Sequence, residues 1–246
     1  MPIFTDGMDD HNLQGSNYGF SAKRIEDLGA TEYTLVGIAG DHSGSVDQFR
    51  QEIEDCIKEI IKACRQSPRA DNLMLRLISF DTRLDEIHGF RPLSECDVDA
   101  YTGCVRPGGM TALYDAGCNV TDSITQYGKN LTENDFDVNA IVFVITDGMD
   151  NASTMTANEI KRSLQNAVQS EALESILSIL VGVNVNDPSV SQWLKALHQN
   201  AGFTQYVELG DAKAATLAKL ADFISRSISA QSQALGTGGP SQSLSF

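Results

Sequence analysis

Three short segments of this chain carry oxygen-bearing side chains next to glycine: Asp41-His42-Ser43-Gly44-Ser45, Pro107-Gly108-Gly109-Met110-Thr111 and Thr146-Asp147-Gly148. Together they offer the carboxylates of Asp41 and Asp147 and the hydroxyls of Ser43, Ser45 and Thr111. None of them offers a thiol or an imidazole at metal-ligand spacing. An all-oxygen set suits a hard cation such as Mg²⁺, Mn²⁺ or Ca²⁺ better than zinc.

The spacing of these residues has a physical meaning. Asp41, Ser43 and Ser45 occupy alternate positions of one tight turn, so their oxygens can point to a common centre. The glycines at 44, 108 and 109 let the backbone approach that centre without a Cβ in the way. The pattern therefore predicts one cation held by side chains from three separate segments.

The elements that must position these segments alternate between two patterns. Short apolar runs predict strands, and apolar residues at helical spacing predict helices. We expect strands at 33–39, 73–80, 86–90, 140–146, 176–183 and 205–209, with 86–90 at an edge, and helices at 46–64, 113–127, 160–168, 190–197 and 217–228. This alternation predicts an α/β fold with a mainly parallel sheet and helices on both faces. In such sheets ligands gather outside the carboxyl ends of the strands, which is where Asp41 and Asp147 fall.

Asp41-x-Ser43-x-Ser45, Thr111 and Asp147 resemble, at all five positions, the metal-ion-dependent adhesion site of the von Willebrand factor A (VWA) family. The resemblance covers about residues 31–229, with an N-terminal arm at 1–30 and a Gln/Ser/Gly-rich tail at 230–246. It implies a three-layer Rossmann-like fold with one antiparallel edge strand. It also implies that these five residues bind a divalent cation, Mg²⁺ first, with Mn²⁺ or Ca²⁺ as alternatives. Asp41 and Asp147 would act largely through bound waters.

The resemblance further implies a role. One coordination position stays open, and in the family a partner protein's Asp or Glu often fills it. Two carboxylates balance the divalent charge, so an incoming carboxylate is not repelled. We therefore expect a protein-interaction module of stand-alone bacterial type and not an enzyme. Its expected partner is an AAA+ ATPase or a kinase/phosphatase system, in a stress-response or defence setting.

The composition of the chain argues against several other classes of function. A formal net charge of −15 repels phosphate backbones and anionic lipid head groups, so nucleic acid and membrane are not expected partners. The number of cysteines is five, and Cys56 and Cys64 lie in a helical pattern, where buried free thiols are expected. The first residues lack a secretory signal, and no apolar run is long enough to span a bilayer. These features favour a cytoplasmic protein.

Other interpretations stay open or are weakened by the residues. A calcium loop of the EF-hand kind would need glycine where Val46 stands. A serine hydrolase would need a G-x-S-x-G turn, which the segment around Ser43 does not supply. A Mg²⁺-dependent phosphohydrolase, an extracellular adhesion-type VWA module and a VWA scaffold that never binds metal remain alternatives.

Four details carry their own expectations. Ala39-Gly40 stands where bulkier residues are common, so we expect the first strand to end loosely. His42 is expected at the rim of the site, and Asp150 either beside the ligands or in solvent. The tail is expected to be a flexible end, or a docking peptide anchored by its last apolar residues.

Overall fold

The computed structural model describes residues 7–13, 16, 18–183, 185, 187–210, 216 and 219–228. Its centre is one eight-stranded sheet in the order β1-β2-β5-β4-β3-β6-β7-β8. The strands are β1 (Met8–Asn12), β2 (Gly19–Lys23), β3 (Glu32–Asp41), β4 (Leu73–Phe80), β5 (Leu84–Pro92), β6 (Asp137–Thr146), β7 (Ser175–Val183) and β8 (Gln205–Leu209). The tail at 230–246 lies outside the described residues, so its predicted behaviour stays a prediction.

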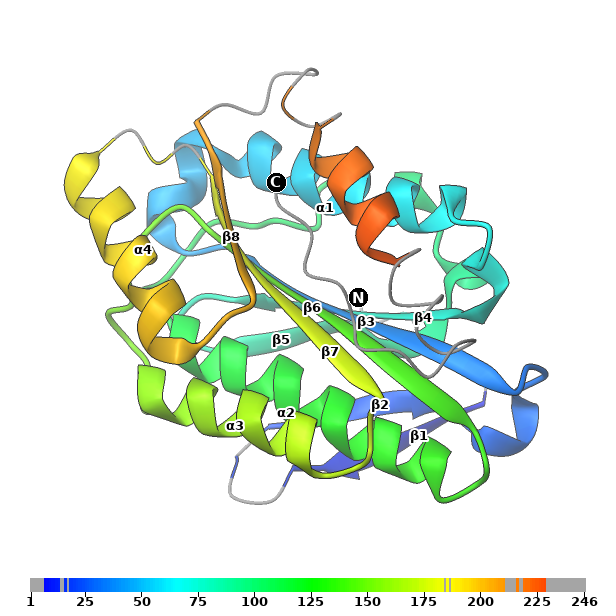
Figure 1. Ribbon diagram of the computed structural model, residues 1–246. Coiled ribbons are helices and arrows are strands. Elements are labelled where there is room, and N and C mark those ends of the chain that lie inside the picture. The colour runs from blue at the N-terminus through cyan, green and yellow to red at the C-terminus, as the bar shows by residue number, and fades with distance from the viewer. Residues whose placement is uncertain are drawn as a thin grey trace.

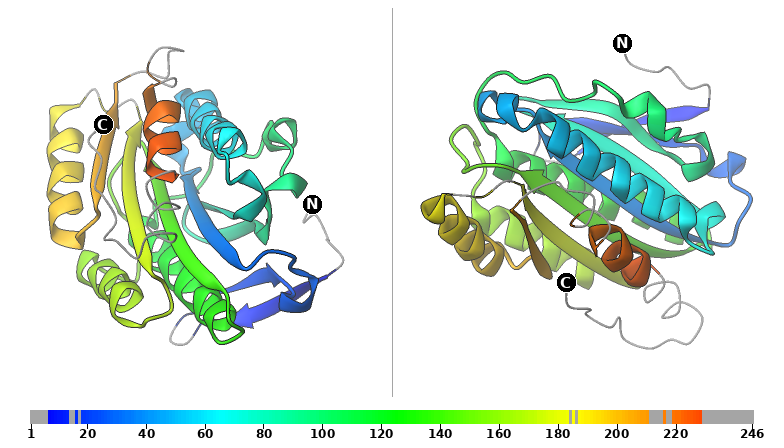
Figure 2. Two further views of the ribbon diagram at one scale, coloured as in Figure 1. Left: turned by 45° about the vertical axis from the view of Figure 1, so that its right-hand side comes forward. Right: turned by 90° about the horizontal axis from the view of Figure 1, so that it is seen from above.

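Helices cover both faces of this sheet (Figures 1 and 2). One face packs against α1 (Arg50–Gln66) and the helical residues 219–228, and the other against α2 (Leu113–Thr132), α3 (Ala157–Gln169) and α4 (Pro188–Ala201). Each face has its own apolar core, because the central strands are buried on both sides. The predicted α/β class, with three layers and a Rossmann-like arrangement, is confirmed.

Five strands, β4, β3, β6, β7 and β8, lie side by side in that order and are parallel to one another. Strand β5 runs antiparallel to β4. The N-terminal arm continues the sheet beyond β5. Its strand β2 meets β5 at Ala22 and Phe90, and β1 pairs antiparallel with β2. These two strands were not expected from the sequence, and because of them β5, expected at an edge, lies between β2 and β4.

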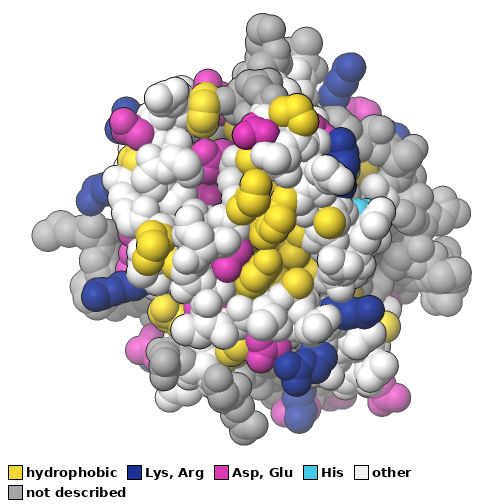
Figure 3. Space-filling model, turned by 90° about the vertical axis from the view of Figure 1, so that its left-hand side faces the viewer, with side chains coloured by type: hydrophobic (Ala, Val, Ile, Leu, Met, Phe, Trp, Pro, Cys, Tyr) yellow, Lys and Arg dark blue, Asp and Glu magenta, His cyan; other side chains and the backbone are white. Residues whose placement is uncertain are grey.

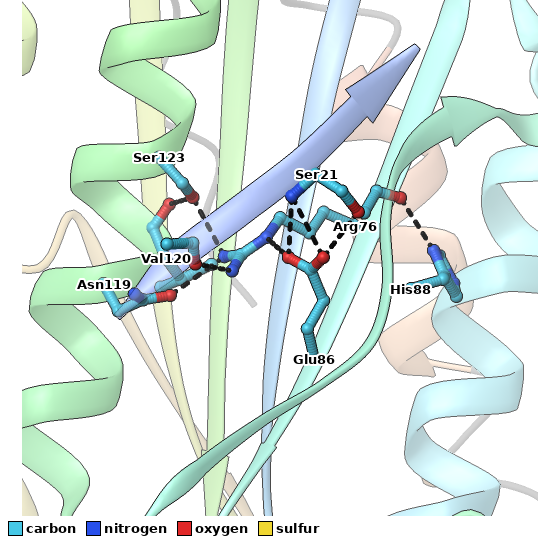
Figure 4. A network of polar contacts seen from close by, with 9 residues as sticks. Ser21, Arg76, Glu86, His88, Asn119, Val120 and Ser123 are labelled. Carbon is cyan, nitrogen blue, oxygen red and sulfur yellow. Dashed lines mark hydrogen bonds and ion pairs between the residues drawn. The ribbon is translucent and has the colours of Figure 1, made fainter. Parts of the chain in front are cut away.

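An ion pair between a buried arginine and a partly buried glutamate ties this N-terminal hairpin to the sheet (Figure 4). Arg76 of β4 is 1% exposed, and its Nε donates to Glu86 of β5 at 2.7 Å. Its Nη1 donates to Asn119 and Ser123 of α2, each at 3.0 Å. Glu86 in turn accepts hydrogen bonds from the backbone N–H and the hydroxyl of Ser21 in β2, at 3.0 and 2.6 Å. One cation therefore joins two strands, a helix and the hairpin.

Two expectations about apolar positions need correction. The first strand does not end loosely: Ala39 and Gly40 pair with both β4 and β6. Gly40 is small because a Cβ there would lie 3.0 Å from Cδ1 of Ile57 on α1, so the helix packs directly on this strand. The apolar spacing that predicts the helix at 160–168 ends on Val168, which is not in the core, since it is 67% exposed.

Cys56 and Cys64 are fully buried, as expected, and burial raises the pKa of both thiols to about 12. All five cysteines are free. Among the described residues, no helix is both long and apolar enough to cross a membrane.

Candidate metal centre

The register of the central strands brings the predicted site together. Asp41 is the last residue of β3 and pairs with Phe80 of β4, while its neighbour Gly40 pairs with Ile145 of β6. Because parallel strands share their carboxyl edge, Thr146 and Asp147 follow β6 at the level of Asp41. The site therefore follows from the pairing of strands about one hundred residues apart.

Asp41 is 0% exposed, and two hydrogen bonds fix its carboxylate. The backbone N–H of Ser43 donates to Oδ1 at 2.8 Å, which closes the tight turn. The hydroxyl of Thr146 donates to Oδ2 at 2.6 Å. The sequence had drawn attention to Thr146 only as the residue before Asp147, and its contact shows that it orients Asp41.

The two serines link Asp41 to the second carboxylate. The hydroxyl oxygens of Ser43 and Ser45 lie 3.1 Å apart, and the Ser45 hydroxyl donates to Oδ1 of Asp147 at 3.0 Å. Four of the five predicted ligands thus form one continuous chain of contacts. The turn of Asp41 and the loop of Asp147 meet through it.

The loop that carries Thr111 is tied to both other segments by its backbone. The Gly108 N–H donates to the His42 carbonyl at 2.9 Å, and the Gly44 N–H donates to the Gly109 carbonyl at 3.1 Å. On the other side, the Thr111 N–H donates to the side chain of Asn151 at 2.7 Å. Thr111 is 4% exposed. Its backbone is placed at the site, although no hydrogen bond joins its hydroxyl to the other four ligands among the described residues.

Electrostatics explain why this arrangement calls for a cation. Burial raises the pKa of Asp41 to about 6, and the charge of Asp147 adds to the increase. Burial also raises the pKa of Asp147. Within the described ranges, neither carboxylate forms an ion pair with a lysine, an arginine or a histidine. A buried carboxylate beside a partly buried one, without a protein cation, is costly, and a divalent ion would remove that cost.

The donor set fits a hard ion. The predicted ligands all offer oxygen, and the part of the chain that the structure describes contains no group of three or more His, Cys, Asp or Glu side chains that could hold a metal ion, so the serine and threonine hydroxyls would have to complete the site. The predicted ligands therefore agree in chemistry with Mg²⁺ or Mn²⁺.

His42 differs from its expected place, and Asp150 has hydrogen-bond partners of its own near the ligands. His42 is 7% exposed, and its Nε2 lies 3.7 Å from Oδ2 of Asp81, so it is largely buried against the loop after β4 instead of lying open at the rim. Asp150 accepts a hydrogen bond from the Tyr114 N–H at 3.3 Å and contacts the Ser153 hydroxyl, so it stabilises the start of α2.

Asn151 is the residue that sequence reasoning missed. Its side chain accepts from the Thr111 N–H, and its own N–H donates to the Thr111 carbonyl at 3.0 Å. No motif points to it. The only signal is its place four residues after Asp147, on the loop that must face the Thr111 segment.

Comparison with known proteins shows which solved structures share this fold. No family model and no curated protein matches the chain. Among solved structures, PilB minor pilin from Streptococcus sanguinis aligns with a TM-score of 0.59 at 16% identity, over 89% of this chain and 66% of the pilin. Proximal thread matrix protein 1 from the mussel byssus, with a zinc-occupied MIDAS (metal-ion-dependent adhesion site) motif, aligns with a TM-score of 0.53 at 14% identity, over 80% of this chain and 46% of that protein. The fold is VWA-like.

A third structural neighbour is the pilus adhesin SpaC from Lactobacillus rhamnosus GG, with a TM-score of 0.55 at 12% identity, over 90% of this chain and 35% of the adhesin. At identities this low the likeness shows the fold alone. This chain spans two thirds or less of the length of each of these three proteins.

Proposed function

We propose that this chain is a metal-dependent interaction module, in which Asp41, Ser43, Ser45, Thr111 and Asp147 hold one divalent cation and the cation binds a carboxylate of a partner protein. The observation that carries the proposal is the contact chain from Asp41 through both serines to Asp147. It joins the buried carboxylate of Asp41 to the partly buried carboxylate of Asp147, and neither has a cationic partner among the described residues.

The ligand chemistry supports this role over catalysis. Hydroxyl ligands leave a divalent ion electrophilic, and two carboxylates leave it without surplus negative charge. An Asp or Glu from a partner is a suitable further ligand for such an ion. Mg²⁺ is our first choice, with Mn²⁺ and Ca²⁺ as alternatives, and zinc belongs in the tests because one structural neighbour carries it at this motif.

The metal is tested by calorimetric titration of EDTA-treated protein with Mg²⁺, Mn²⁺, Ca²⁺ and Zn²⁺. We expect one site per chain in the native protein and none in Asp41→Ala, with an unchanged circular dichroism spectrum. Asp47→Ala is the matched control, because Asp47 is exposed two residues after Ser45 and would be a ligand only in an EF-hand-like loop. Equal binding by the native protein and Asp41→Ala would refute the proposed site.

A Mg²⁺-dependent phosphohydrolase is the enzyme alternative. It would need a positive clamp beside the ion, and no lysine or arginine pairs with Asp41 or Asp147 in the described ranges. We propose that the protein does not hydrolyse p-nitrophenyl phosphate with Mg²⁺ or Mn²⁺. Turnover that disappears in Asp41→Ala would favour the enzyme.

The setting of the module is a separate proposal. An AAA+ ATPase or a kinase/phosphatase system as partner follows from the sequence resemblance alone, whereas a cytoplasmic location follows from the free cysteines and the other composition features given above. The pilus proteins among the structural neighbours favour the alternative of an extracellular adhesion-type module. Fractionation of native cells, followed by detection of the protein, distinguishes the two locations.

A further inference from the structure

Met110 exposes a large apolar side chain beside the candidate metal. It is 52% exposed, and Val168 is the only other large hydrophobic residue of the described chain with comparable exposure. Met110 lies directly before Thr111, whereas Val168 lies near the end of α3, at the opposite edge of the sheet. A single exposed methionine is ordinary on a protein surface. Met110 differs in its place next to a predicted ligand and in the rigid backbone that holds it.

The backbone on both sides of Met110 is held firmly. Its own N–H donates to the hydroxyl of Thr82 at 2.9 Å, and the next N–H, that of Thr111, donates to Asn151 at 2.7 Å. Before it, Gly109 has a φ of +68°, and a Cβ there would lie 2.6 Å from Oδ2 of Asp81. The loop therefore presents the backbone of Met110 in one place, so that only the side chain has to be ordered when a partner binds.

The surrounding surface is also partly apolar. Figure 3 looks onto the end of the molecule where the parallel strands finish, and hydrophobic side chains gather near its centre with acidic side chains among them. In the first turn of α2, Tyr114 stacks on Trp193 of α4 with ring centroids 6.1 Å apart, and both rings are partly exposed. The candidate metal thus lies at an end of the fold that offers apolar contact area.

We propose that Met110 is the apolar half of a two-part docking surface. In this arrangement, which rests on the proposed function, the partner places a carboxylate on the cation and a large apolar side chain, adjacent in its sequence, against Met110. The partner segment also carries lysine or arginine around that carboxylate, because the net charge of −15 on this chain repels an acidic segment and attracts a basic one. The occupant is therefore a basic protein segment with one Asp or Glu next to a large apolar residue.

The probe is a phage-displayed library of random twelve-residue peptides. It is selected on the Mg²⁺-loaded protein and eluted with EDTA. In parallel it is selected on Met110→Ser and on Val168→Ser. The Val168→Ser variant is the control, because it removes a similarly exposed apolar side chain far from the site. Calorimetry first checks that both variants bind Mg²⁺ as the native protein does.

We expect EDTA-eluted peptides with an Asp or Glu beside a large apolar residue and an excess of Lys and Arg. Selection on Met110→Ser should retain the acidic residue and lose the apolar one, while Val168→Ser behaves as native. A peptide selected on the native protein should bind Met110→Ser about tenfold more weakly, the size expected when roughly half of a methionine side chain loses its burial.

Two results overturn the inference and leave the proposed function intact. They are metal-dependent acidic peptides without apolar enrichment, and the same apolar enrichment on Met110→Ser. Peptides whose binding needs neither an acidic residue nor metal, or no enrichment at all on Mg²⁺-loaded protein, count against the carboxylate-binding function itself.

Discussion

Replacing Asp41 by asparagine should stabilise the metal-free protein. Asp41 is fully buried, and burial raises its pKa from 3.8 to about 6. The ionised carboxylate of Asp41 is therefore less stable in the folded chain than in the unfolded one. Asparagine has the same shape without the charge. Thr146 can adapt, because its hydroxyl lies 3.3 Å from the Gly148 carbonyl and can donate there while accepting from the new amide.

The sign and size follow from linkage. A folded-state pKa above the unfolded value means that the folded protein binds the proton more tightly, so ionisation of Asp41 lowers stability as pH rises from about 4 to about 6. Above pH 6 the cost is fully present, and the difference between the two pKa values corresponds to about 3 kcal/mol. At pH 5.0 about half of that cost remains.

The assay is urea unfolding in EDTA at pH 7.5 and 5.0, which avoids the low solubility expected near the sequence pI of 4.5. We expect Asp41→Asn to be more stable than the native protein by about 3 kcal/mol at pH 7.5 and by about half as much at pH 5.0. Asp47→Asn is the control and should change little at either pH. Saturating Mg²⁺ should reverse the order, because only the native protein gains binding energy. An Asp41→Asn protein that is less stable than native in EDTA at pH 7.5 would refute this reasoning.

Three further predictions concern the supports of the site and the fold. Gly109→Ala should lower the free energy of unfolding by more than about 1 kcal/mol and weaken Mg²⁺ binding, because the φ of +68° and the contact with Asp81 both oppose a Cβ. Urea unfolding measures the first effect and calorimetry the second. A variant that changes neither would contradict the role of this turn. Arg76→Met should cost about 3 kcal/mol in urea unfolding, since it leaves Glu86 without its cation; a cost under about 1 kcal/mol would show that the ion pair does not hold the hairpin. Deletion of residues 231–246 should leave the thermal midpoint nearly unchanged, and a large drop would show that the tail packs on the domain.

The core of the fold is predictable from the sequence because its signals are local. The strand that ends at Asp41 and the strand that ends at Thr146 are both rich in apolar residues, and both are buried at every position but the first, as expected for strands covered on both faces. Once both strands are placed as parallel neighbours, their shared carboxyl edge brings Asp41 and Asp147 together. Four of the five candidate ligands are indeed joined by contacts.

The N-terminal hairpin is not predictable in this way. Its strand β1 is acidic and mostly solvent-exposed, so no apolar pattern identifies it. What holds the hairpin is a contact between Ser21 and Glu86, which are 65 residues apart, together with the buried cation of Arg76. A pairing of this kind depends on the tertiary structure, and neither residue reveals it alone.

The surroundings of the site show the same limit. The position of Thr111 depends on Asn151, which is 40 residues away and belongs to no motif. In the sequence, Gly40 suggests a loosely ended strand. In the structure, Ile57 of α1 packs against it, which explains why the residue is small. Residue types therefore predict the ligands, and the packing between elements determines how they are held.

Whether the five oxygen-bearing side chains hold one divalent cation can be seen in a crystal structure of the protein grown with Mn²⁺, with anomalous differences recorded near the manganese edge. We expect one anomalous peak per chain, among Asp41, Ser43, Ser45, Thr111 and Asp147, and no peak there in Asp41→Ala. Manganese bound elsewhere, or a native crystal without a peak at this turn, would contradict it.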